Sequence, residues 1–67
     1  MIPFYDAIKR VLLHGKCMKR MAWPENYCIL CNESDTKSYV LLNTGTNFEL
    51  YIPSSDDLVA EDWYERR

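Results

Sequence analysis

The spacing of apolar residues changes at Gly15, and this change constrains the fold more than any other feature of the chain. Before Gly15, apolar residues recur every three or four positions, a period that predicts an amphipathic helix over residues 3–14. The predicted buried stripe consists of Phe4, Ala7, Ile8, Val11 and Leu12. Pro3 suits the first helical position, and Gly15 suits a left-handed stop just after His14. We therefore expect one N-terminal helix.

After Gly15, short apolar runs alternate with polar turns, a pattern that predicts β-strands. The expected strands span residues 17–23, 27–32, 38–43, 47–52 and 62–66. Residues 43–46 predict a hairpin loop with Gly45 at positive φ, and residues 32–37 predict a second polar turn. Such short connections favour antiparallel neighbours. The predicted fold class is α+β, with the N-terminal amphipathic helix packed on a small antiparallel β-sheet in a single domain over residues 1–67.

The expected strands differ in what their two faces carry. In strand 47–52, every second residue is apolar: Phe48, Leu50 and Ile52. We expect this set to meet the helix, which leaves Tyr51 on the outer face. The runs 28–31 and 40–42 are apolar on both faces, which is unusual for strands that face solvent on one side. One face of the sheet is therefore expected to contact another subunit.

The length of the chain limits its core. A domain of 67 residues buries only about 60% of its unfolded surface, and such domains usually gain support from disulfides, a metal or self-association. The chain has an odd number of cysteines, Cys17, Cys28 and Cys31, and shows no export signal, so we expect free thiols and self-association.

No apolar stretch reaches the roughly 18 residues of a membrane helix, which favours a cytoplasmic protein without a membrane partner.

The formal charge of −2 is unevenly distributed. Residues 1–20 carry five bases and one acid, whereas residues 21–67 carry nine acids and three bases. The five N-terminal bases are Lys9, Arg10, Lys16, Lys19 and Arg20. They can bind phosphate, but the acidic remainder repels a long polyanion, which needs an extended basic track. A small phosphorylated ligand is therefore expected in preference to a nucleic acid polymer.

Four potential metal ligands have paired short spacings. Two residues separate His14 from Cys17, two also separate Cys28 from Cys31, and soft ligands in such pairs can form a tetrahedral zinc site. Against zinc, an extended strand directs Cys28 and Cys31 to opposite faces. Buried thiols are the simpler interpretation, and no metal site is expected.

A second set is acidic and consists of Asp56, Asp57, Glu61 and Asp62. Such carboxylates can hold a hard cation or act as a general base, but residues 54–57 also suit the cap of a helical turn that begins near Leu58. His14 is the only histidine, and no nucleophile has a recognisable local motif. We therefore expect no catalytic residue and no cofactor, and the protein is not expected to be an enzyme.

A third set combines aromatic and basic side chains. Arg20 and Trp23 fall on one expected strand, Tyr51 falls on another, and Ser54 follows shortly after it. Flat rings stack on nucleobases, and a guanidinium pairs with phosphate through a fork of hydrogen bonds. The set favours a nucleotide ligand, with ordinary core packing as the alternative for Trp23 and Trp63.

Two stretches resemble the second type of Thoeris anti-defence protein, a family of small phage proteins that sequester cyclic nucleotide immune signals. The first resembles the family's opening helix, its glycine–lysine turn and its arginine-to-tryptophan strand: Phe4-x-x-Ala7-Ile8 and Gly15-Lys16-x-Met18-x-Arg20-x-x-Trp23. The second is similar to the family's closing signature: Tyr51-x-Pro53-Ser54-x-x-Asp57-Leu58-Val59-Ala60-Glu61-Asp62-Trp63. Together they cover about half of the chain. Tyr51 stands where a tryptophan is common, and residues 27–50 are shorter than in most members.

The resemblance implies a homo-oligomer, a tetramer or a dimer, that encloses a cyclic ADP-ribose isomer or a cyclic dinucleotide and releases it unmodified. Such molecules signal in Thoeris and CBASS immunity. The implied ligand-binding residues are Arg20, Trp23, Tyr51, Ser54 and Asp57. Of these, Trp23 and Tyr51 would stack on the ligand and Arg20 would pair with phosphate. Ser54 and Asp57 would form hydrogen bonds with ribose or base.

By the same resemblance, Asp62 and Trp63 are assigned mainly to structure.

Three other functions remain as alternative hypotheses. The protein could instead be an enzyme that cleaves such a signal, or an inhibitor that contacts a host defence protein through its apolar strands. A small zinc-binding domain is the last alternative.

Overall fold

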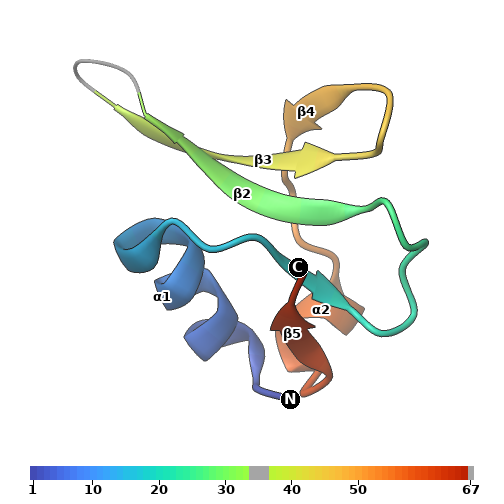
Figure 1. The fold of residues 1–67 in the computed structure, drawn as a ribbon. Coiled ribbons are helices and arrows are strands. Elements are labelled where there is room, and N and C mark those ends of the chain that lie inside the picture. Colours follow the sequence, from blue (N-terminus) through green and yellow to red (C-terminus); the bar gives the residue numbers. More distant parts are fainter. Residues whose placement is uncertain (34–36, 67) are drawn as a thin grey trace.

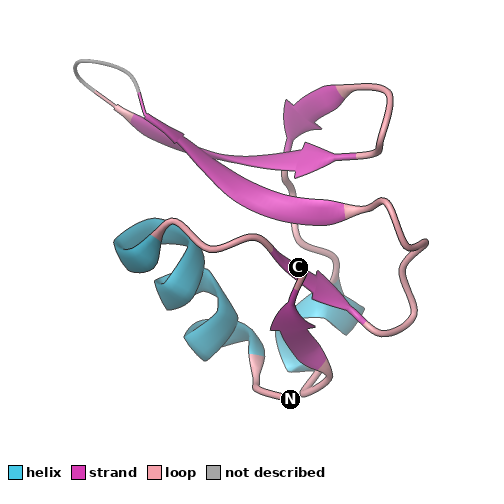
Figure 2. Cartoon of the chain, in the orientation of Figure 1, coloured by secondary structure: helices cyan, strands magenta, loops and turns pink. Residues whose placement is uncertain are grey.

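The described part of the chain forms two helices and a five-stranded sheet (Figures 1 and 2). The computed structural model describes residues 1–33 and 37–66. The elements, in chain order, are α1 (Phe4–His14), β1 (Met18–Arg20), β2 (Cys28–Glu33), β3 (Ser38–Asn43), β4 (Phe48–Leu50), α2 (Ser55–Val59) and β5 (Trp63–Glu65). The predicted α+β class is confirmed. Neither described helix has the length and apolar character needed to cross a membrane.

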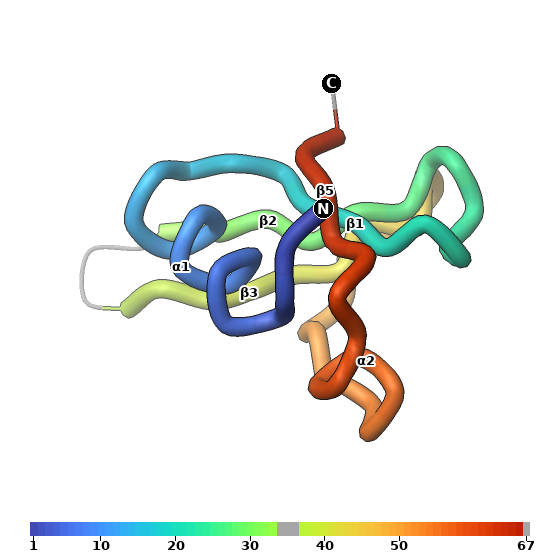
Figure 3. Tube along the Cα trace, turned by 90° about the horizontal axis from the view of Figure 1, so that it is seen from below, coloured from blue at the N-terminus to red at the C-terminus, as the bar shows by residue number. Residues whose placement is uncertain are grey.

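The sheet has the strand order β4-β3-β2-β1-β5, and every neighbouring pair is antiparallel. The long β2–β3 hairpin forms its centre, and the short strands β4 and β5 form its edges (Figure 1). Helix α1 lies against one face of the sheet (Figures 1 and 3). The N-terminus lies beside β5, where Ile2 and Trp63 exchange two backbone hydrogen bonds (Figure 3).

Helix α1 ends as the sequence predicts. Gly15 has φ of 65°, and the N–H of Lys16 donates to the carbonyl of Arg10 at 3.1 Å, which closes the last turn. At the other end, Pro3 is the residue before the helix and not its first helical residue. The left-handed glycine directs the chain back along the sheet, so that β1 begins only three residues later.

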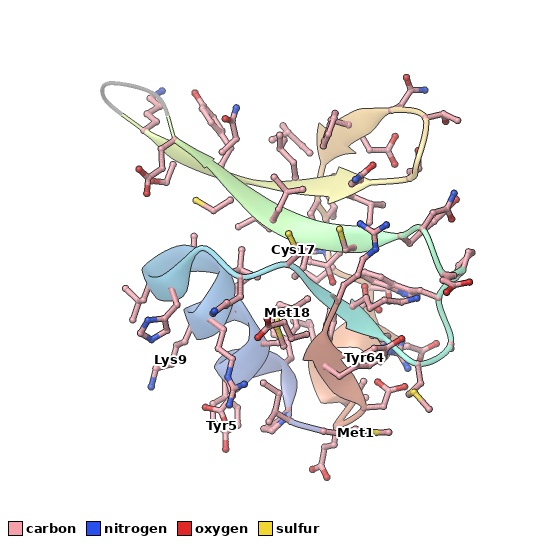
Figure 4. The ribbon with its side chains drawn as sticks, in the orientation of Figure 1. Met1, Tyr5, Lys9, Cys17, Met18 and Tyr64 are labelled. Atoms are coloured by element: carbon pink, nitrogen blue, oxygen red, sulfur yellow. The ribbon has the colours of Figure 1, made fainter. Side chains whose placement is uncertain are left out.

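The core lies between α1 and the sheet. Its fully buried members are Ala7, Val11, Met18, Ile29 and Trp63, and Figure 4 shows Met18 between β1 and α1. The Phe4 ring meets the Trp63 indole edge-on at 5.5 Å between ring centroids. The predicted stripe was wrong at its end, because Leu12 is 42% exposed. The helix contacts the sheet through the row that contains Ala7 and Val11. Leu12 follows Val11 round the helix axis and lies beside this row, nearer to solvent.

The register divides the sheet into a covered face and an open face. Ile29 lies opposite Leu42, and Leu42 lies opposite Glu49. Ile29 is in the core, so this row belongs to the face under α1. The next row, Leu30, Leu41 and Leu50, belongs to the other face. We call this second side the open face, since no described helix packs on it.

The prediction for the β4 segment was wrong in its orientation. Phe48 and Leu50 are each 63% exposed and Ile52 is 84% exposed, whereas Tyr51 is half-buried and packs against the core. The alternation was correct, but the polar phase faces inward because Tyr51 finds a hydrogen-bond partner there. A one-residue change of phase exchanges the two faces of a strand.

The turns agree with expectation where they are described. Gly45 has φ of 92°, as the hairpin between β3 and β4 requires. Part of the polar turn expected over residues 32–37 lies outside the described residues, and Asn32 and Glu33 belong to β2.

Candidate ligand-binding site

A groove of about 620 Å³ lies between the segment that follows β1 and the segment from β4 to α2. All five predicted ligand-binding residues line it: Arg20, Trp23, Tyr51, Ser54 and Asp57. The structure therefore brings together residues that are up to 37 positions apart. Two of them were placed in the wrong element, because β1 ends at Arg20 and β4 ends at Leu50. Trp23 and Tyr51 follow these strands.

The carboxylate of Asp57 is the centre of the site. Its Oδ2 accepts hydrogen bonds from the Tyr51 hydroxyl at 2.8 Å and from the Ser54 N–H at 3.2 Å. Its Oδ1 accepts from Arg20 Nη1 at 3.1 Å. Asp57 is only 7% exposed, so these three donors replace water around a buried charge.

Helix α2 fixes the position of Asp57. Ser54 is the N-cap, and its side chain accepts a hydrogen bond from the Asp57 N–H at 3.1 Å while Asp57 accepts one from the Ser54 N–H. This reciprocal pair is a capping box. The capping prediction was correct in kind, but the helix begins at Ser55 and not near Leu58. The two predicted polar site residues are therefore also the residues that start α2.

Arg20 connects two carboxylates. Its Nε donates to Asp62 at 3.1 Å and its Nη1 donates to Asp57 at 3.1 Å. A guanidinium has five N–H donors, so three remain beyond these two bonds. The Arg20 side chain is 18% exposed, and it lines the groove from a fixed position.

A row of three aromatic rings leads from the core to the groove. The Trp23 indole contacts Trp63 edge-on at 5.1 Å between ring centroids and Tyr51 at 6.1 Å. Trp63 is fully buried, and its Nε1 donates to the carbonyl of Asp57 at 3.3 Å. Trp63 thus has the contacts of a core residue, whereas Trp23 and Tyr51 are half-buried and line the groove.

The loop that carries Trp23 is held by a buried lysine. Lys19 is 3% exposed, and its Nζ donates to the carbonyl of Pro24 at 2.9 Å and to that of Trp23 at 3.4 Å. The Trp23 N–H also donates to the carbonyl of Arg20 at 3.2 Å, which forms a tight turn after β1. These hydrogen bonds therefore fix the backbone of Trp23 independently of a ligand.

The pKa shifts follow from these contacts. Burial raises the pKa of Asp57, but hydrogen bonds from Tyr51, Ser54 and Arg20 outweigh burial and lower it below the ordinary value. Burial, and then the hydrogen bond to Asp57, raise the pKa of the Tyr51 phenol. Hydrogen bonds to Asp62 and Asp57 raise the pKa of Arg20. The site therefore holds a carboxylate, a guanidinium and a neutral phenol at neutral pH.

Comparison with known proteins identifies the family. The model of the Tad2-like domain, described as the Thoeris anti-defense 2-like domain, matches residues 2–65. The chain belongs to the Tad2-like family. No curated protein matches the chain. The match covers both stretches that carry the resemblance, and membership of this family supports a Thoeris anti-defense role.

Sequence reasoning missed several residues that line the groove of this Tad2-like domain. The added residues are Pro24, Tyr27, Leu42, Glu49, Leu50 and Ile52, and Asp56 of the acidic set considered above also lines the groove. Glu49 had a usable signal, because it lies two positions before Tyr51 and so shares its face. Leu50 and Ile52 were assigned to the helix side. No local signal marked Tyr27.

The possible zinc ligands do not assemble. Within residues 1–33 and 37–66, no group of three or more His, Cys, Asp or Glu side chains is placed to hold a metal ion. All three cysteines are free. Cys28 is buried on the open face and Cys31 packs against the core from the covered face, as the strand alternation predicts.

Proposed function

We propose that this Tad2-like domain sequesters a small cyclic nucleotide immune signal in the host cytoplasm, either a cyclic ADP-ribose isomer or a cyclic dinucleotide, and does not cleave it. The supporting observation is the groove, in which Trp23, Tyr51 and Arg20 are fixed by contacts inside the chain. Preorganised groups bind a ligand with less loss of conformational entropy.

Each group in the groove has a role that fits a nucleotide. The rings of Trp23 and Tyr51 offer stacking surface for a base, and the remaining N–H groups of Arg20 can donate to phosphate oxygens. The hydroxyl of Ser54 accepts from Asp57, so its proton is free to donate. Exposed Glu49 can accept hydrogen bonds from ribose hydroxyls.

The charges that line the groove favour a contribution of cations from a second subunit. Among the described residues that line the groove, Arg20 is the single cation, and it shares the groove with the acids Glu49, Asp56 and Asp57. A doubly anionic ligand therefore needs further cations. Bases on and after α1 line a separate concavity of about 460 Å³ together with acidic Asp6 and Glu65: Lys9, Arg10, His14 and Lys16. We expect these bases from one subunit to approach the ligand bound by another.

The open face of the sheet provides a surface for this association. Leu30, Leu41 and Leu50 form one apolar row across it, and Phe48 lies on the same face with 63% of its surface exposed. Apolar surface of this kind on a small domain favours burial against a partner. A dimer or a tetramer formed through this face would complete the site.

Binding without cleavage fits the chemistry of Asp57. A general base needs a free lone pair and a pKa near the working pH. Asp57 already accepts three hydrogen bonds, and these contacts lower its pKa. The most buried carboxylate of the groove is therefore suited to hold Arg20 and Tyr51 in place and poorly suited to remove a proton.

Calorimetry tests the proposal with a cyclic ADP-ribose isomer and a cyclic dinucleotide as ligands. Trp23→Ala should weaken binding by about 1–3 kcal/mol through loss of stacking, and Trp23→Phe should recover part of the loss. Tyr5→Ala is the matched control, because Tyr5 is an aromatic residue that is 66% exposed on α1 and points away from the sheet (Figure 4). Absence of heat with every ligand at micromolar protein would reject the proposal.

Direct contact with a host defence protein is the second candidate, because the apolar row on the open face fits a protein partner as well as a second copy. Under that function, the wild-type protein would block defence while free signal persists in the infected cell. Under the proposed function, signal would be depleted from the cell by the wild-type protein.

A further inference from the structure

A second cavity, of about 510 Å³, lies apart from the groove. We call it the Lys19–Arg66 cavity; its lining residues are Lys19, Glu25, Asn26, Tyr64 and Arg66. It shares no lining residue with the groove, although residues 21–27 contribute to both. The two cavities therefore lie on different sides of one loop.

The sheet register explains why two cations meet in this cavity. Lys19 of β1 lies directly opposite Tyr64 of β5, and its Nζ is 5.8 Å from the centre of the Tyr64 ring. Arg66 comes two residues after Tyr64, and its N–H donates to the carbonyl of Cys17 at 2.8 Å, which continues the strand pairing. Residues two apart on a strand share a face, so Lys19, Tyr64 and Arg66 lie on one side of the sheet. Figure 4 shows Tyr64 beside these two strands.

Lys19 is a buried cation that forms no ion pair with any acid among residues 1–33 and 37–66. The residue is 97% removed from solvent, because its exposed fraction is 3%. Its two hydrogen bonds go to neutral backbone carbonyls, and within the described residues no acidic side chain forms an ion pair with it. A buried charge is costly unless an opposite charge accompanies it. One of the three N–H donors of the ammonium is not used by these bonds.

Arg66 adds a second cation, and most of its N–H donors are unused. Its Nη1 contacts the sulfur of Cys28 at 3.7 Å. Sulfur is a weak acceptor, so this contact positions the guanidinium without neutralising its charge. Exposed Asn26 contributes an amide, and exposed Glu25 contributes a carboxylate. Counted over the described residues, the lining carries two positive charges and one negative charge.

We propose that the Lys19–Arg66 cavity is a second binding site, specific for a phosphate group or a similar oxyanion. The Lys19 ammonium provides the buried positive charge, the Arg66 guanidinium provides a fork of N–H donors, and Tyr64 forms the wall between them. The bound group is either free phosphate or the phosphate of a mononucleotide. This inference does not depend on the function proposed for the groove.

Nuclear magnetic resonance tests the site on the full chain, with inorganic phosphate added at constant ionic strength. Saturable shifts are expected at the amides of Lys19, Asn26 and residues 64–66. Arg66→Gln should weaken phosphate binding about tenfold through loss of charge-assisted hydrogen bonds. Glu25→Gln should tighten binding about twofold, because it removes the opposing charge.

Controls separate this site from nonspecific attraction to bases. Lys9→Gln removes an exposed α1 base outside the cavity, and it should leave phosphate affinity unchanged. A parallel titration with adenosine monophosphate distinguishes the sources, since tighter binding than phosphate identifies a nucleotide phosphate and equal binding identifies free phosphate. Shifts that do not saturate, shifts centred on residues 9–16, or an Arg66→Gln variant with unchanged affinity would each overturn the proposal.

Discussion

Replacing Asp57 with asparagine changes one charge at the centre of the site and keeps its shape. An asparagine oxygen in the place of Oδ2 can still accept from the Tyr51 hydroxyl and the Ser54 N–H. The amide nitrogen then replaces Oδ1 and faces Arg20 Nη1, which is also a donor. Arg20 therefore loses one of its two carboxylate partners and keeps Asp62.

The expected loss follows from burial and from the surviving contacts. Removing one partner of a fully buried ion pair costs about 3–5 kcal/mol. The Arg20 and Asp57 side chains are 18% and 10% exposed, and Arg20 keeps Asp62, so we expect about 2–3 kcal/mol. A domain of this size has a free energy of unfolding of about 3–10 kcal/mol. Asp57→Asn should therefore remove a large part of the stability.

Urea denaturation followed by tryptophan fluorescence measures this loss, because Trp63 is buried and Trp23 contacts it. Glu61→Gln is the control, since Glu61 is an exposed acid with no hydrogen bond or ion pair to the site. The control should unfold at the wild-type midpoint. An Asp57→Asn midpoint within about 0.5 kcal/mol of wild type would refute the conclusion that the Arg20–Asp57 bond organises the site.

Four further results are expected. Because contacts lower the pKa of Asp57 in the fold, its stabilisation is complete above the unfolded pKa of about 4 and is lost as pH falls through the folded value, so wild type should lose more stability than Asp57→Asn between about pH 5 and pH 2 in urea titrations. Ser54→Ala should lower the free energy of unfolding by about 1 kcal/mol through loss of the α2 cap, and an unchanged urea midpoint would argue against the capping box. Gly45→Ala should cost about 1–2 kcal/mol by calorimetric melting, because φ is 92° and the added methyl would meet the side chain of Asn26. Leu50→Lys should produce monomers in sedimentation velocity, and persistent oligomers would place the contact elsewhere.

The features that depend on local spacing could be predicted from the sequence. The apolar period and Gly15 located α1, and Gly45 located the β3–β4 turn. The serine-to-aspartate spacing at 54–57 predicted a helix cap. The five site residues were chosen by resemblance as well as by chemistry, and the fold brings all of them to one groove.

The features that depend on long-range partners could not be predicted. Alternation in the β4 segment was visible, but its phase is set by the hydrogen bond from Tyr51 to Asp57. The carboxylates that hold Arg20 lie 37 and 42 positions away. Lys19 looked like one more N-terminal base, and only the fold shows that it is buried and bonded to the Trp23 loop. Local pattern carries no information about such pairings.

Recovery of the ligand after binding tests the central claim most directly. The protein is incubated with a cyclic ADP-ribose isomer and separated from free ligand by filtration. The retained fraction is then heated to release what was bound, and the released molecule is identified by chromatography and mass. We predict that the cyclic molecule is retained in fixed proportion to protein and returns unchanged. Recovery of a linear product, or passage of all the ligand through the filter, would contradict the account.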